Sequence, residues 1–134
     1  MLHECIIGKI RYIINRLDEI IFRLKKIYKI LYVKMLISDR TSKQIFANEM
    51  HEVRQIVRKL MIVQISLELI QRYQIIPYDL LVIIEKMLKP LSMKLYLELK
   101  ILEDVAEKAT NVTKTLMAEA TRIAEERIKL WAEN

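Results

Sequence analysis

The side chains best suited to metal or acid–base chemistry in this sequence are its two histidines, His3 and His51. His51 and Glu52 would begin a zinc-protease helix motif, but Gln55 stands where the second histidine ligand belongs. A di-iron helical bundle needs a glutamate three residues before a histidine, and neither histidine has one. The sequence therefore predicts no metal and no other cofactor.

Nucleophiles and phosphate-binding loops are equally scarce. The one cysteine, Cys5, cannot form an internal disulfide, which favours a cytosolic protein. One glycine and two prolines leave no material for glycine-rich phosphate loops or for most turns between strands. The carboxylates are scattered, without an evident pair. We predict an all-α protein that is not an enzyme.

Basic side chains are the chemistry that the chain does concentrate. Residues 1–76 hold 14 Lys and Arg against 7 Asp and Glu, whereas residues 98–134 hold 6 against 8. Lys9, Arg16 and Arg23 are spaced by seven, so they form one row along a helix. This one-sided excess favours contact with anionic lipid or with nucleic acid.

We expect two long helices to carry these charges, from Cys5 to Ile37 and from Thr41 to Ile76, joined by a turn at residues 38–40. Asp39, Thr41 or Ser42 would be the N-cap of the second helix. Apolar residues alternate in steps of four and three along both, as in a coiled coil. We therefore expect a long antiparallel helical hairpin. Its predicted core comprises Ile13, Leu17, Ile20, Leu24, Val53, Val57 and Leu60.

Prolines divide the remaining chain into three shorter helices. Pro77 disfavours helical geometry in the residue before it, so we expect a break near Ile76 and a buried helix from Tyr78 to Leu88. Further helices are predicted from Leu91 to about Ala109 and from Thr113 or Lys114 to Trp131. These would fold back on the hairpin or pack on a neighbouring subunit.

The domain prediction is a single unit, made of the hairpin (residues 1–76), the third helix (77–89) and the last two helices (90–134). The longest stretch without a charged residue, Leu60 to Leu67, is far too short to cross a bilayer. The first residues also lack the basic and apolar regions of a signal peptide. We expect a cytoplasmic protein that associates with membranes only peripherally.

The middle of the second long helix contains a more specific pattern. The segments ANEMHEVR, residues 47–54, and QISLELI, residues 64–70, resemble the pattern of ESCRT-III proteins, and of the archaeal cell-division (Cdv) members in particular. The matching positions are Ala47, Asn48, Glu49, Glu52, Arg54, Leu67 and Glu68. The order, lengths and charge split of the predicted helices agree with the same family.

This resemblance implies a subunit that assembles into filaments with itself and with other ESCRT-III paralogues, and that remodels anionic membrane in cell division or in vesicle or virus budding. It implies lipid contacts for Lys9, Arg11, Arg16, Arg23, Lys25, Lys26 and Lys29. A Vps4-type AAA ATPase is a further implied partner, although no binding tail for it is recognised before Asn134. We expect a short paralogue, viral or accessory, or a core fragment.

A basic helical protein that binds or coats nucleic acid is the alternative, and a coiled-coil adaptor is a third interpretation. No row of aromatic residues is set among the basic ones, which disfavours the stacking used to bind single strands. Nucleic acid is therefore the less favoured partner.

Overall fold

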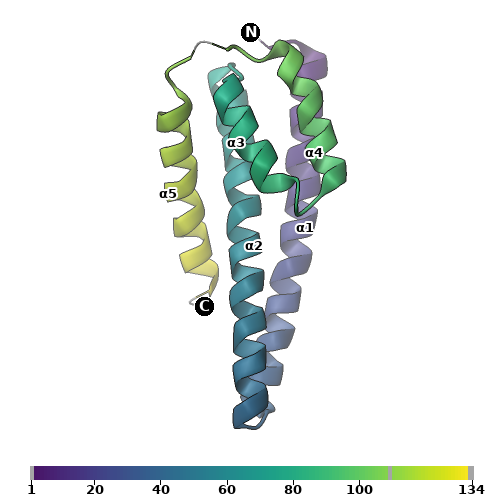
Figure 1. Ribbon diagram of the computed structural model, residues 1–134, viewed down its shortest axis with the longest axis vertical. Coiled ribbons are helices and arrows are strands. Elements are labelled where there is room, and N and C mark those ends of the chain that lie inside the picture. Colours follow the sequence, from purple (N-terminus) through teal and green to yellow (C-terminus); the bar gives the residue numbers. More distant parts are fainter. Residues whose placement is uncertain (1, 109, 133–134) are drawn as a thin grey trace.

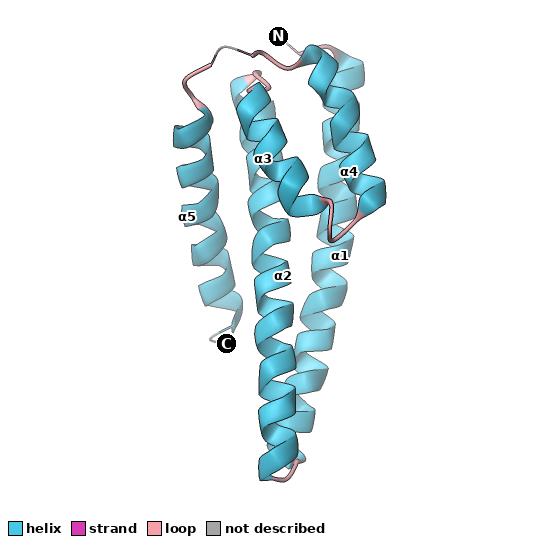
Figure 2. Ribbon diagram, viewed as in Figure 1, coloured by secondary structure: helices cyan, strands magenta, loops and turns pink. Residues whose placement is uncertain are grey.

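The computed structural model describes residues 2–108 and 110–132, which form helices without a sheet (Figures 1 and 2). The two long helices are α1 (Glu4–Ile37) and α2 (Arg40–Tyr73), and they pack against each other along their lengths. Shorter elements follow: α3 (Tyr78–Leu88), α4 (Met93–Lys100), the 3-10 helix η1 (Ile101–Val105) and α5 (Thr113–Ala132). The predicted all-α hairpin with three shorter helices is confirmed.

Local capping fixes the ends of the hairpin helices. At the start of α1, the His3 Nδ1 atom accepts a hydrogen bond from the Cys5 backbone N–H at 3.1 Å. At the turn, an Asp39 carboxylate oxygen accepts from the Ser42 backbone N–H at 2.8 Å. That bond and a second one from the Ser42 hydroxyl lower the pKa of Asp39. Asp39 is thus the cap among the three candidates that the sequence offered.

Helix α2 ends at Tyr73, three residues before the predicted Ile76. Gln74 takes a left-handed conformation, φ 58°, and so ends the helix. Its side chain holds this end in place, because Nε2 donates to the Gln71 carbonyl at 2.7 Å and Oε1 accepts from the Leu2 N–H at 3.0 Å. The next residues can therefore run extended into Pro77.

The predicted helix from Leu91 to about Ala109 is the larger error. Ser92 caps α4, which ends at Lys100. The chain then continues as the 3-10 helix η1 and becomes extended at Ala106. The cause is a long-range backbone pairing: the Glu107 N–H donates to the Ile76 carbonyl at 2.8 Å, and the Tyr78 N–H donates to the Glu107 carbonyl at 2.9 Å. An extended strand-like segment can make these bonds and a helix cannot. The predicted end at Ala109 lies outside the described residues.

Helix α2 is the central element. α5 packs along it and against α3, α3 also contacts α4, and α4 lies on α1 (Figure 1). Every residue from Leu60 to Leu67 is buried, in keeping with the absence of charge there. The Gln64 side chain reaches the Ile14 carbonyl at 3.2 Å and Asp18 at 3.3 Å, which sets the register between α1 and α2.

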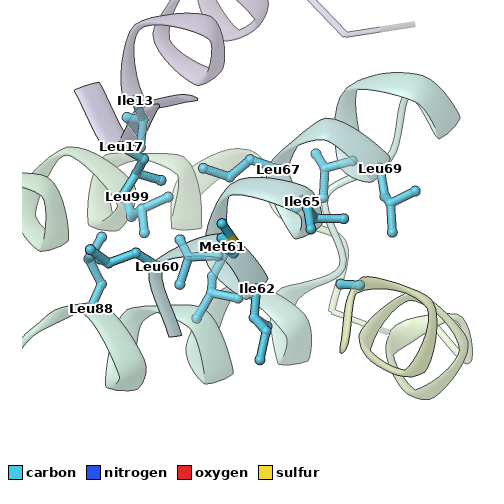
Figure 3. Packing of buried hydrophobic residues seen from close by; sticks show 14 of the residues in the cluster. Ile13, Leu17, Leu60, Met61, Ile62, Ile65, Leu67, Leu69, Leu88 and Leu99 are labelled. Atoms are coloured by element: carbon cyan, nitrogen blue, oxygen red, sulfur yellow. The ribbon is translucent and has the colours of Figure 1, made fainter. Parts of the chain in front are cut away.

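The core lies around this buried stretch (Figure 3). Four of the seven predicted hairpin-core residues are buried, namely Ile13, Leu17, Val57 and Leu60. Ile20, Leu24 and Val53 are half-buried and pack against the core. Among the described residues, burial therefore decreases along the hairpin from the end that α3, α4 and α5 cover toward the turn.

Candidate functional site

The turn end of the hairpin projects beyond α3, α4 and most of α5 (Figure 1). We call residues 22–54, the second half of α1 and the first half of α2, the distal arm. Eight large apolar side chains are exposed on it, an unusual density for a surface that faces water. They are Phe22, Ile27, Ile30, Tyr32, Val33, Leu36, Ile37 and Ile45.

The distal arm is also strongly basic. It carries eight Lys and Arg against three acidic residues, a net charge of +5, and no acidic residue lies between Glu19 and Asp39. Within the part of the chain that the structure describes, no basic residue of the arm forms an ion pair. The eight are Arg23, Lys25, Lys26, Lys29, Lys34, Arg40, Lys43 and Arg54. Their charge is therefore available to an external partner.

The covered end of the hairpin differs. Lys9 forms an ion pair with Glu98 of α4 at 3.0 Å, and Arg16 pairs with Glu19 at 2.5 Å. Among the seven side chains that the resemblance assigns to lipid contact, these two are thus already neutralised. Arg11, Arg23, Lys25, Lys26 and Lys29 form no ion pair within the described residues.

One face of the arm combines both kinds of side chain. Phe22, Lys26, Ile30, Val33 and Ile37 follow one another in steps of four, four, three and four, so they lie along one side of α1. All five are exposed, whereas the seam residues Ile21 and Leu31 on the opposite side are buried. The Lys26 ammonium lies over the Phe22 ring, 4.5 Å from its centroid. We call these five residues the outer row.

Helix α5 docks on its own hairpin. Arg58 pairs with Glu125, and Arg127 lies 3.8 Å from Glu68. At its end, the Trp131 ring lies 4.8 Å from that of Tyr28 and beneath the Lys25 ammonium. These contacts leave the outer row untouched, because none of its five members takes part in them.

The residues that carry the family resemblance lie at two levels of α2. Glu49, Glu52 and Arg54 are exposed on the arm, Ala47 is half-buried, and Asn48 accepts a hydrogen bond from Gln44 at 2.9 Å. Leu67 is buried in the core, and Glu68 is the partner of Arg127. Within the described residues, His, Cys, Asp and Glu form no group that could hold a metal ion.

Sequence reasoning missed Glu85 of α3. Its side chain is only 5% exposed and one carboxylate oxygen has no hydrogen-bond partner. Burial raises its pKa to about 7, and Glu103 of η1 adds to the rise while Lys100 opposes it. The available signal was its position, four residues after Leu81 and three before Leu88, on the buried face of an apolar helix.

Comparisons with family models, with curated proteins and with solved structures gave no match. Within the described residues, no helix has the length and apolar character needed to span a membrane. The functional argument therefore depends on the distal arm itself.

Proposed function

We propose that this chain is an ESCRT-III-like subunit that assembles on anionic membrane and remodels it, from the cytoplasmic side. The observation that carries the proposal is the distal arm. There, basic side chains that form no ion pair with any described residue share one projecting surface with exposed apolar side chains. A lipid headgroup layer accepts both kinds of side chain at once. Other paralogues and the AAA ATPase remain part of the proposal through the family resemblance.

The electrostatic contribution is large enough to matter. Each Lys or Arg near an anionic membrane contributes about 1 kcal/mol, and the attraction extends about one Debye length, ~8 Å at physiological salt. Losing three arm lysines alone would therefore cost about 3 kcal/mol, or roughly a hundredfold in affinity. Binding should also weaken as salt is added.

Assembly is supported by a second uncovered apolar row. Met93, Leu97 and Ile101 follow one another in steps of four along α4 to its C-cap, so they lie on one side of that helix, and each is about half exposed. Residues 93–105 hold two Lys against three Asp and Glu, whereas the arm is basic. A contact on neighbouring copies between this row and arm side chains outside the outer row would join unlike surfaces. Such a contact generates open filaments when the rotation does not close a ring.

Nucleic acid is the second candidate partner, because the same basic arm could neutralise phosphates. The exposed apolar side chains argue against it, since protein–DNA interfaces are polar as well as basic. Anionic lipid explains both halves of the surface.

The test is flotation with vesicles of phosphatidylcholine and phosphatidylserine, in parallel with a DNA mobility shift at the same salt. The variant Lys26→Glu, Lys29→Glu, Lys34→Glu should lose flotation. The control Lys86→Glu, Lys94→Glu, Lys114→Glu makes the same change in total charge at exposed positions away from the arm and should float. A parent protein that shifts DNA and does not float would favour the alternative.

A further inference from the structure

We infer that the outer row is an insertion site, whose apolar side chains enter the headgroup layer of an anionic bilayer while its lysine stays at the surface. This inference rests on the proposed function and deepens it, because it makes binding partly apolar and assigns that part to named side chains. Membrane binding by electrostatic attraction alone would need only the basic side chains of the arm.

Exposure is the first observation. Phe22, Ile30, Val33 and Ile37 are 59%, 54%, 56% and 82% exposed. Side chains of this size on the same side of one helix leave apolar area in water that a partner would cover with a gain in free energy.

The composition of the row decides what that partner is. Lys26 stands within the row, and Lys29 is exposed one residue before Ile30. Lysine is depleted at the centres of protein–protein interfaces, because its charge must be desolvated there. At a bilayer, the long lysine stem can lie along apolar surface while the ammonium reaches the phosphates. A row that mixes lysine with Phe, Ile and Val therefore fits a lipid surface better than a second protein.

The geometry allows the contact without any unfolding. From Phe22 to Ile37 the row is about 22 Å long at the rise of an α-helix. The seam side of α1 stays packed on α2, so the hairpin would lie on the membrane with its outer side down. Interfacial helices of this kind bury their apolar face roughly 5–10 Å deep.

The direct test places an environment-sensitive NBD dye at two matched positions in the full-length chain. Cys5, which is exposed, is first replaced by Ser, and the dye is then attached through Val33→Cys or Tyr73→Cys. These two residues are 56% and 52% exposed, but Tyr73 lies at the end of α2, outside the outer row. With phosphatidylcholine and phosphatidylserine vesicles, the dye at residue 33 should shift to the blue and be quenched by lipids that carry a nitroxide, whereas the dye at residue 73 should stay as in buffer.

Each outcome decides the inference. If the protein floats while the dye at residue 33 remains in a water-like environment, insertion is wrong and the electrostatic proposal stands. If the protein does not float, both the insertion site and the proposed membrane binding are wrong. If both dyes shift alike, the outer row is not the insertion site.

A pair of double variants measures the apolar part separately. Val33→Ser with Ile37→Ser should weaken vesicle binding by about tenfold or more at high salt, where the electrostatic part is screened. Tyr73→Ser with Ile83→Ser, which removes exposed large side chains from α2 and α3 outside both apolar rows, should leave binding within about twofold. Equal losses in the two variants would overturn the inference, and unchanged helical circular dichroism would show that both proteins are folded.

Discussion

Shortening Leu17 to alanine tests the seam on which the hairpin depends. Leu17 of α1 is fully buried in the core, and a buried Leu→Ala change costs about 2–5 kcal/mol. We take about 3 kcal/mol. With an unfolding entropy of about 2.1 cal/mol/K per residue, a chain of this length should melt about 10 °C lower.

Three further variants on the same helix provide internal comparisons. Ile20→Ala, at a half-buried position, should give an intermediate loss. Phe22→Ala, at a position that is 59% exposed, should cost within about 0.5 kcal/mol, as surface substitutions usually do. Leu17→Asp would leave an unpaired charge in the seam and should cost still more than Leu17→Ala.

Far-UV circular dichroism follows the loss of helix during heating or in urea, at a concentration where the protein is monomeric. The expected order of stability is the parent and Phe22→Ala together, then Ile20→Ala, then Leu17→Ala. Equal losses for Leu17→Ala and Phe22→Ala would refute the reasoning, because two positions on opposite sides of α1 would then be equally covered.

Three other predictions follow from the caps, the buried carboxyl and the end of α5. Asp39→Ala should lower the unfolding free energy by about 1 kcal/mol in urea, through loss of the cap on α2, whereas Glu49→Ala on the exposed side of α2 should not. The pKa of Glu85 rises from 4.5 to about 7 on folding, so its carboxyl ionises at lower pH in the unfolded chain and the free energy of unfolding should fall as the pH rises between these values. Glu85→Gln should remove the share of this fall that Glu85 causes. A melting temperature of the parent protein that does not change over this pH range would contradict the prediction. Trp131→Ala removes the contact with Tyr28 and should increase the fraction of protein that sediments, if α5 covers surface that assembly needs; a smaller sedimenting fraction would show that α5 is itself a contact between subunits.

Periodicity and local capping were sufficient to predict the helices whose ends are determined nearby. The start of α1, the turn at Asp39 and the whole of α3 depend on residues within a few positions of each other, so the sequence shows them directly. The ends of α2 and α4 could not be predicted in this way. At the end of α2, the Gln74 side chain accepts a hydrogen bond from the Leu2 N–H, 72 positions away. After η1, the backbone bonds of Glu107 with Ile76 and Tyr78 keep the chain extended where the periodicity predicts a helix.

The candidate site, too, could be predicted only in part from the sequence. A basic α1 was visible in the sequence, but its neutralisation near the N-terminus was not, since Lys9 pairs with a residue 89 positions away. The apolar surplus of α1 was visible as well. Which part of it would remain uncovered depends on how far α4 and α5 extend along the hairpin, and that is a property of the folded chain.

Electron microscopy of the concentrated protein with vesicles of phosphatidylcholine and phosphatidylserine tests the central claim most directly. The account predicts filaments on the anionic vesicles, and none on vesicles of phosphatidylcholine alone or with the variant Lys26→Glu, Lys29→Glu, Lys34→Glu. Vesicles that stay bare with the parent protein, or that carry the same filaments with that variant, would contradict it.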